Sequence, residues 1–551
     1  MKPRIGPYVV AFVSIAIIWT LYVMSNHYRY WESTGQEMPN MGSSIRNGVL
    51  GALGLLVAAY AATFAWVHRP ASASPAEASP QPRSESAVLA KGFNGSPAML
   101  SLSGENFVLE VRGVGVFTGE LFNTEIWQRI EAKSDNHASF LSQNPEDYPD
   151  NDTSRLDDMS LAKGIGFKGA VRHAVQQWPV PVIVWQPPRD PKNQFRPATS
   201  IAGARQRAGL GVSIFLWQED ANTNDGAAMI AKLFAFFDTH PDAPAALVYS
   251  IDGSMLRSLL GAPGSGGPSQ AGHIIPAMPD SVGALLVTRS DRVDKLIRPF
   301  AVEQTANVNK TNTEYDIIKL WNFYWAQDRV FQELKDKEDG EYVSALVPKA
   351  DWWQTQLPEL WRTLGNQGPG QFTPTPYIPV RWTTWQLRQF DNAPLLGYLH
   401  RPVDIRLTDD HGKPLKTALQ ADAIKAGWTK AASALPGGIE PKRVFYDTTD
   451  DRRWVIPLNQ ALSQTGHSAP NLDEVKEGYD IGARIGNTGV SSPLIQLGLG
   501  LIASYNEGGA SATVNRRPNG MASIVMVSPP EPSIKQAWSQ QNHGANPFRL
   551  R

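Results

Sequence analysis

Strand-like and helix-like segments alternate along this sequence from residue 107 onward, and this alternation constrains the fold more than any other feature. Short apolar runs are followed by stretches with the three- to four-residue apolar spacing of helices. Such an order predicts an α/β fold with a largely parallel sheet covered by helices on both faces. In the first part, strands are expected at 107–116, 180–186, 211–218, 245–252 and 284–288, helices at 120–133, 167–178, 224–239, 254–260 and 291–300, and loops at 144–158 and 261–269.

The alternation is interrupted once, and the interruption predicts two α/β domains. A long helix at 313–337 closes the first domain, 91–340, and a stretch rich in Trp, Pro and Gly, 341–375, connects it to the second, 376–530. Residues 531–551 are expected to form a tail, and no repeat of fixed period relates the two parts. In the second part, helices are expected at 382–390 and 415–434, after Leu472 and after Pro493, and strands at 395–407, 443–446 and 522–527.

Two uncharged apolar runs precede these domains, at about 7–25 and 48–67. Each is long enough to span, or nearly span, a hydrocarbon core of about 30 Å as a helix. The sequence therefore predicts that residues 1–69 form a membrane anchor with two transmembrane helices. A linker of Pro, Ala and Ser follows at 70–90, and it is too poor in apolar residues to fold.

The anchor has a competing interpretation as a cleavable signal peptide. Ala71, Ser72 and Ala73 resemble a signal-peptidase site, but His68 and Arg69 lie between it and the apolar run. If the anchor is retained, five Lys or Arg residues flank the hairpin and two lie in its connecting loop. The positive-inside rule then places both termini and the soluble body in the cytoplasm.

Composition excludes several classes of function. The 51 Lys and Arg residues are balanced by 52 Asp and Glu residues, so no basic excess indicates a nucleic-acid partner. There is no cysteine, which excludes disulfides, thiolate zinc sites and cysteine nucleophiles. The ten histidines are scattered, with no pair at helical spacing beside a carboxylate, and give zinc no support.

One serine occupies the place of a hydrolase nucleophile. In VYSIDGSML, Ser254 follows an expected strand and begins an expected helix. The nucleophile elbow Gly-x-Ser-x-Gly needs glycines where this chain has Asp252 and Leu256. A tight turn that caps the helix is the simpler account of Gly253 and Ser254.

Two further motifs are incomplete. Gly113, Gly115 and Gly119 follow a strand, but their last spacing is one residue too long for a dinucleotide fingerprint. Close packing of a strand against a helix explains these glycines equally well. Asp220, Asn222 and Asn224 have the alternate spacing of a calcium loop, but the glycine is displaced to 226 and position 231 is Ala. Side-chain caps on the next helix, with Asp225 near its positive end, are the better account, so no metal or cofactor is expected.

Tryptophan is abundant, with 17 residues and close pairs at 321 and 325, 352 and 353, and 382 and 385. Two interpretations remain open. The rings fill cores or seal the junction between domains, or they form a protein–protein surface, where tryptophan is enriched.

Three long stretches resemble the lipase adaptors of type VI secretion. They are FVLEVRGVGVFTGELFNTEIWQRIEAK from Phe107, PVPVIVWQPPRD up to Asp190, and GNTGVSSPLIQLGLGLIASYNEGG up to Gly509. The resemblance covers about residues 88–530. It implies a non-enzymatic protein that binds a phospholipase effector in the cytoplasm and helps load it onto the secretion spike, with no catalytic residues to carry over. The two membrane helices are additional to a minimal soluble adaptor and fit a version that works at the inner membrane.

The leading hypothesis is therefore an inner-membrane-anchored, two-domain adaptor whose partner-binding residues are unknown. One alternative is a membrane-tethered α/β hydrolase that uses Ser254. Another is a structural component of an envelope complex with no effector client.

Overall fold

The computed structural model describes residues 107–133, 137–193, 195–262, 271–303, 315–340, 346–437, 439–466 and 468–550, with isolated positions at 19, 20, 23, 46 and 48. The chain divides into two compact units, Met1–Pro97 and Ala98–Arg551. Within the described residues, no helix is long and apolar enough to cross a membrane. The predicted membrane helices at 7–25 and 48–67 and the linker at 70–90 lie outside them, apart from those isolated positions.

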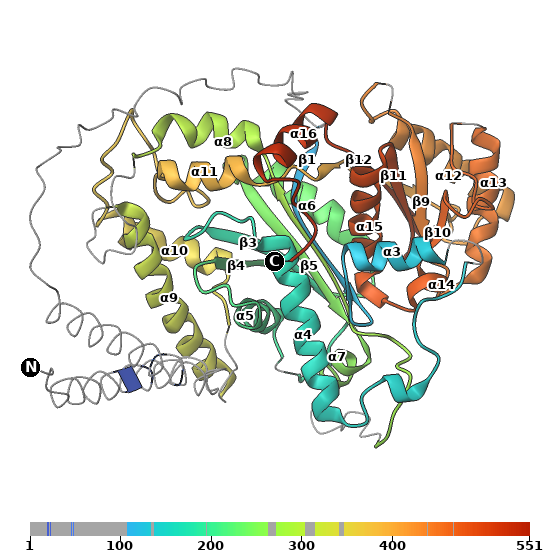
Figure 1. Ribbon diagram of the computed structural model, residues 1–551, viewed down its shortest axis with the longest axis horizontal. Helices are drawn as coiled ribbons and strands as arrows, with labels where there is room; N and C mark the ends of the chain where they lie inside the picture. The colour runs from blue at the N-terminus through green and yellow to red at the C-terminus, as the bar shows by residue number, and fades with distance from the viewer. Residues whose placement is uncertain are drawn as a thin grey trace, which may run out of the picture. The chain divides into compact units, whose positions relative to one another are not determined.

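Twelve strands of the second unit form one mixed sheet (Figure 1). Ten follow the order β10-β9-β11-β12-β7-β1-β6-β5-β3-β4, while β2 pairs with β1 and β8 pairs with β12. The strands are β1 (Leu109–Thr118), β2 (Leu121–Phe122), β3 (Pro179–Gln186), β4 (Ile214–Asn222), β5 (Ala245–Asp252), β6 (Ser281–Thr288), β7 (Gly397–Leu399), β8 (Val403–Arg406), β9 (Pro441–Tyr446), β10 (Gly478–Asp480), β11 (Ala510–Arg517) and β12 (Met521–Ser528).

The sheet consists of two halves with the same topology. Outward from the centre, the N-terminal half runs β1-β6-β5-β3-β4 and the C-terminal half runs β7-β12-β11-β9-β10. In each half the first two pairings are antiparallel and the last two are parallel. The halves meet where β1 pairs with β7. A duplicated topology is therefore present although the sequence has no repeat of fixed period.

This topology confirms the mixed α/β architecture but corrects its details. The prediction of largely parallel sheets is wrong, because β6 and β12 each return antiparallel to the strand before them without a crossover helix. The predicted domains, 91–340 and 376–530, correspond to the two halves, and these share one sheet through β1 and β7. Residues 98–551 accordingly form a single compact unit.

Helices cover the sheet on both faces (Figure 1). α4 (Asp152–Val171) and α5 (Pro197–Arg207) contribute to a hydrophobic cluster of the N-terminal half. α12 (Thr417–Ala432) and α13 (Val455–Thr465) contribute to one of the C-terminal half. The smaller helices α3 (Thr124–Ala132), α7 (Ser254–Leu259), α8 (Ser290–Leu296) and α14 (Ile481–Ile485) lie in the connections.

Two helices, one from each half, pack into a central core to which strands of both halves also contribute. α6 (Ala228–Thr239) and α15 (Ser492–Glu507) bury their apolar residues in the cluster that includes inward side chains of β1, β3, β9 and β12. Every residue from Ser492 to Tyr505 is buried. A helix buried on all sides must be nearly free of charge, which explains the sequence SPLIQLGLGLIASY.

Local signals account for two differences between prediction and structure. The loop expected at 144–158 is helical from Asp152, because the Asn151 side chain caps α4 by accepting a hydrogen bond of 2.9 Å from the Ser154 backbone. Gly113 and Gly115 lie inside β1, against α4. A Cβ on either would lie within 1.8 Å of a carbonyl oxygen of Ala170 or Gly166, so the close-packing account of these glycines is confirmed.

The Trp-rich region forms a core of its own. α9 (Asp316–Asp339), α10 (Ala350–Trp361) and α11 (Thr384–Asn392) share this core with residues of the edge strand β4, and α10 lies in the predicted connection 341–375. Trp353 and Trp382 are buried, with exposures of 0% and 2%, while the rings of Trp321 and Trp325 lie 5.5 Å apart and half-buried. Core filling is therefore the correct interpretation of the buried tryptophans.

The predicted tail is an ordered part of the unit. α16 (Pro532–Gln541) is followed by Phe548, which is 1% exposed in the central core. The Asn123 side chain donates a hydrogen bond of 3.0 Å to the carbonyl oxygen of Phe548, and Trp538 donates one of 3.0 Å to that of Asn392. This segment therefore packs across both halves.

Candidate functional site

The starts of the two central helices meet between the halves of the sheet. A Cβ on Gly226, before α6, would lie 2.2 Å from the carbonyl oxygen of Val490, before α15. This approach explains why glycine occupies position 226, where the calcium-loop pattern did not predict it. We call the region around these two helix starts the junction of the halves.

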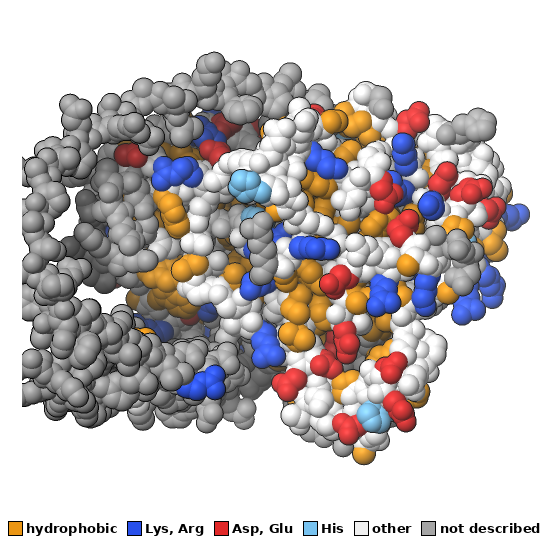
Figure 2. Space-filling model, viewed as in Figure 1, with side chains coloured by type: hydrophobic (Ala, Val, Ile, Leu, Met, Phe, Trp, Pro, Cys, Tyr) orange, Lys and Arg blue, Asp and Glu red, His pale blue; other side chains and the backbone are white. Residues whose placement is uncertain are grey.

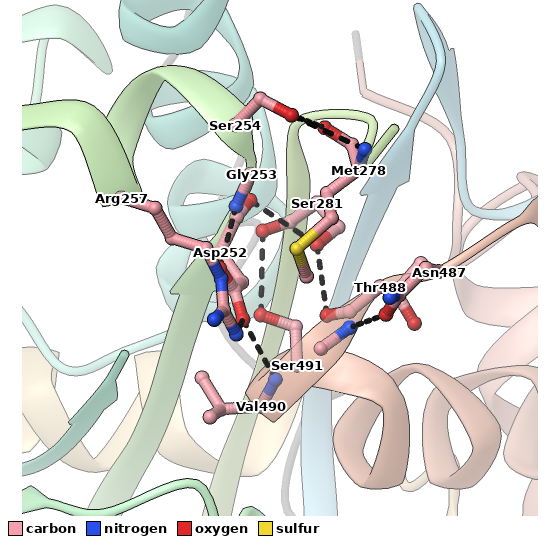
Figure 3. A network of polar contacts seen from close by, with 11 residues as sticks. Asp252, Gly253, Ser254, Arg257, Met278, Ser281, Asn487, Thr488, Val490 and Ser491 are labelled. Atoms are coloured by element: carbon pink, nitrogen blue, oxygen red, sulfur yellow. Dashed lines mark hydrogen bonds and ion pairs between the residues drawn. The ribbon is translucent and has the colours of Figure 1, made fainter. Parts of the chain in front are cut away.

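Asp252, at the end of β5, ties the N-terminal half to the start of α15 (Figure 3). Its buried carboxylate accepts 2.8 Å hydrogen bonds from the backbone of Gly253 and of Val490. Arg257 contacts both carboxylate oxygens, also at 2.8 Å, and the carboxylate raises the pKa of Arg257. Four donors satisfy this anion, so its role here is to hold the junction together.

A second polar contact at the junction joins the C-terminal half to the start of α6. Arg517, at the end of β11, contacts Asp225, before α6, through Nη2 and Oδ2 at 2.8 Å and through Nε. Its Nη1 lies 2.9 Å from Asp404. β5 and β11 are topologically equivalent strands, so each half uses the end of the same strand to hold the helix start of the other half.

Ser254 lies where the sequence predicted, at the start of the short helix α7 that follows β5. Its hydroxyl donates to the carbonyl oxygen of Met278 at 3.1 Å and accepts from the Met278 backbone at 3.2 Å (Figure 3). Within the described part of the chain, no histidine or carboxylate is hydrogen-bonded to it. The arrangement of a nucleophile with its base is not assembled here, and the turn interpretation of Gly253 and Ser254 agrees with the geometry.

A groove of about 710 Å³ lies beside this turn. It is bounded by the end of β1, β2, the segment 140–149, the first half of α4, the start of α7 and the segment 274–280. Its apolar lining residues are Phe117, Leu121, Phe140, Leu141, Pro149, Leu161, Met255, Ile274, Ile275, Pro276, Ala277, Met278 and Pro279. Its charged lining residues are Glu120, Arg129, Asp147, Arg155, Asp158 and Asp280.

Contacts from both halves hold the walls of the groove. The Phe140 backbone donates to the carbonyl oxygen of Arg484 at 3.2 Å, and Arg484 donates to that of Lys133 at 2.8 Å. On the opposite wall, Met278 is bonded to Ser254, and Arg155 donates to the carbonyl oxygen of Gly272 at 2.6 Å. The walls of the groove are therefore held by hydrogen bonds within the chain itself.

Two acidic groups of the groove, Asp158 and Asp280, have raised pKa values. Burial, followed by the nearby Asp158 carboxylate, raises the pKa of Asp280 to about 7, while Lys163 opposes that shift. Burial and Asp157 raise the pKa of Asp158. Burial lowers the pKa of Lys163. Asp280 therefore titrates near neutral pH, unlike an ordinary surface aspartate.

The other residues singled out in the sequence do not converge on one site. Asp220 and Asn222 lie in β4, whereas Asp225 accepts a hydrogen bond of 3.2 Å from the Ala228 backbone at the start of α6. The capping account of this segment therefore agrees with the structure, and Asp225 has the additional role of binding Arg517.

The sequence interpretation missed the two features that matter most here. Asp252 was considered only as the wrong residue for a nucleophile elbow, and Asp280 was not singled out. One available signal was the apolar run IIPAMP before Asp280, which has the composition of a buried strand but two prolines that interrupt a strand ladder. An apolar segment that cannot join the sheet is free to line a groove.

Comparison with known proteins identifies both halves. Residues 107–271 match the family model described as type VI lipase adapter protein Tla3, N-terminal, and residues 396–529 match the model for its C-terminal part. The two matches contain β1 to β5 of one half and β7 to β12 of the other.

Among solved structures, similar chains include a ketosynthase from module 6 of the bacillaene synthase of Bacillus subtilis, with 9% identity, 77% of this chain and 71% of that chain covered, and a TM-score of 0.38. A type II ketosynthase complex with its acyl-carrier protein has 12% identity, 77% and 100% coverage, and a TM-score of 0.40. The 3-oxoacyl-(acyl carrier protein) synthase III of Pseudomonas aeruginosa has 11% identity, 77% and 99% coverage, and a TM-score of 0.31. Likenesses this distant carry no argument about function.

Proposed function

This chain belongs to the family of type VI lipase adapter proteins, and from that premise we propose that it binds a lipase effector and helps load it onto the secretion spike without catalysing a reaction itself. The observation that carries the proposal is the pair of family matches, at 107–271 and 396–529, which contain β1 to β5 of the N-terminal half and β7 to β12 of the C-terminal half. An adaptor needs a rigid body with a preformed surface, and the locked junction and the groove supply both.

The proposal includes a position at the bacterial inner membrane, with the body on the cytoplasmic side. Its support is the pair of uncharged apolar runs at 7–25 and 48–67 and the positive charges that flank them. A cytoplasmic body would meet the effector before secretion.

Co-purification of the full chain tests the proposal. The tagged chain, extracted in mild detergent, is co-expressed with each type VI lipase and each spike protein of the organism that encodes it. Recovery of one lipase at defined stoichiometry, and of a spike protein only when that lipase is present, is the expected result. A well-folded chain that binds none of these lipases would refute the adaptor role.

The hydrolase alternative has no observation in its favour, since the hydroxyl of Ser254 is bonded to the Met278 backbone. Esterase activity that is lost in Ser254→Ala would revive it. Recovery of envelope proteins without any lipase would instead favour a structural component of an envelope complex.

A further inference from the structure

We propose that the groove beside Ser254 is the docking site for the effector, and that it receives an apolar segment of the lipase that also carries Lys or Arg. This inference rests on the proposed adaptor function, because it names the surface and the partner chemistry that the function requires. The argument comes from the polarity, the rigidity and the charge of the groove.

The apolar lining of the groove indicates that its occupant is apolar. Leu161 on α4 and Ile275 on the opposite wall line the groove and are 42% and 37% exposed. Large aliphatic side chains with this exposure gain free energy when a partner removes them from water. The prolines Pro276 and Pro279 fix the backbone of one wall, so little conformational entropy is lost on binding.

The position of the groove indicates a protein segment as its occupant. One wall is held by the C-terminal half, through the hydrogen bond from Phe140 to Arg484. The other wall is held by the N-terminal half, through Ser254 and Met278. A partner docked here therefore contacts a surface of the N-terminal half, one wall of which is held in place by the C-terminal half.

Charge indicates the second feature of the occupant. Three acidic residues, Glu120, Asp147 and Asp158, line the groove against two basic ones, and Asp280, which titrates near neutral pH, adds to the acidic side. One of the two basic residues, Arg155, is engaged by Asp152 at 2.8 Å and by the carbonyl oxygens of Pro149 and Gly272. Figure 2 shows Asp and Glu side chains gathered on the lobe at the lower right of the view, where the start of α4 lies. Opposite charges across an interface favour encounter and register, so a basic partner segment is complementary.

A matched pair of substitutions tests the apolar contact. Ile275→Glu places a charge in the groove, and Ile456→Glu places the same charge on α13 of the other half, at a position 54% exposed. The full chain in detergent is titrated with the lipase recovered in the co-purification, by biolayer interferometry. Ile275→Glu is expected to weaken binding at least tenfold, and Ile456→Glu less than twofold. Leu161→Glu repeats the test from the other wall if Ile275→Glu does not fold.

A second pair tests the charge. Asp158→Asn removes an acid from the groove, whereas Asp410→Asn removes an acid whose side chain is 94% exposed in a distant turn. Asp158→Asn is expected to weaken binding three- to tenfold at low salt and to reduce its salt dependence, because exposed charge pairs are screened by salt. Asp410→Asn is expected to change neither property.

The outcomes separate the two proposals. A wild-type chain that binds its lipase while both groove variants bind equally well overturns the docking site and leaves the adaptor function intact. A wild-type chain that binds no lipase overturns the adaptor function and the docking site with it. Groove variants that change self-association or binding to lipid vesicles, but leave lipase affinity unchanged, also overturn the docking site, because the occupant would then be a second copy or a membrane.

Discussion

The two halves of the sheet share one strand order but differ in the connections that link equivalent strands. In the C-terminal half, β11 returns to β12 through the short turn Pro518–Gly520. In the N-terminal half, the equivalent return from β5 to β6 contains α7 and the segment 274–280. The path from β1 to α4 is also extended by β2 and α3. Both extensions of the N-terminal half line the groove.

The comparison indicates that the two halves have different roles. The C-terminal half has the shorter return from β11 to β12 and supplies the buried helix α15 to the central core. The N-terminal half has the longer return from β5 to β6 and the longer path from β1 to α4, and its groove is open to solvent. Loops placed on a rigid scaffold are where binding residues are usually found. Functional substitutions should therefore concentrate in the N-terminal half, and substitutions at the junction should affect stability.

The largest expected effect is a loss of stability when the polar contacts at the junction are removed, and its size should differ between Asp252 and Arg517. Asp252→Ala removes the acceptor of two backbone donors and of Arg257, and it should lower the free energy of unfolding by about 3–5 kcal/mol. Arg517→Ala breaks a contact that is more exposed, at 15% against 0%, and should cost about 2 kcal/mol. Urea unfolding of the full chain measures both. Equal losses would show that the two contacts are energetically equivalent.

The next effect tests whether the two helix starts must touch. Gly226→Ala brings a methyl group to 2.2 Å from the carbonyl oxygen of Val490 and should cost about 3 kcal/mol. Gly211→Ala is the control, because no atom lies within 4 Å of the added carbon. Thermal unfolding of both variants should show a large fall in Tm for the first and little change for the second. An unchanged Tm for Gly226→Ala would mean that the halves can separate at this point.

A smaller effect on stability is expected at Asp280 in the groove, and its size depends on pH. The pKa of Asp280 is about 7, above the value of about 3.9 expected in the unfolded chain. The folded state therefore binds this proton more tightly, and the associated stability is present below about pH 4 and lost as the pH rises through 7. Asp280→Asn should raise the free energy of unfolding at pH 8 by about 2 kcal/mol and change little at pH 4. A destabilised variant at pH 8 would contradict this, and would show that the charged carboxylate is well solvated or paired.

The smallest effect concerns Ser254. Ser254→Ala removes its two bonds to Met278 and should cost about 1 kcal/mol. Lipase binding should be nearly unchanged, since the backbone bond from Ser254 to Met278, of 3.0 Å, remains. The variant is measured in the same unfolding and binding assays as Ile275→Glu. A complete loss of lipase binding would mean that this turn, and not the apolar wall, is the main contact.

Much of the architecture could be predicted from the sequence because it depends on local patterns. The strand at 245–252 and the short helix after it were predicted with nearly correct bounds, since apolar run, glycine and helix signal follow one another directly. The helix at Asp316–Asp339 was predicted in the same way, at 313–337. The start of α4 was missed because one asparagine cap in an acidic, turn-rich segment is a weak signal.

Long-range features could not be predicted. Strand direction depends on how a connection crosses the sheet, and nothing in the residues of β6 distinguishes an antiparallel return from a parallel one. The groove combines residues from Phe117 to Asp280, and its walls are held by Arg484, far along the chain. The lipase resemblance identified the family correctly, but it offered no residue for the contact surface.

The central place of β1 has a consequence for how the protein is made. β1 pairs with β6 on one side and with β7 on the other, so one of its edges stays open until the ribosome has synthesised everything between Thr118 and Gly397. At about 5–20 residues per second this takes on the order of 15–60 s. An open, apolar strand edge in a nascent chain invites pairing with another molecule. Nascent chains of this protein should therefore depend on a chaperone during that interval, and slower translation of the C-terminal half should lower the yield of folded protein.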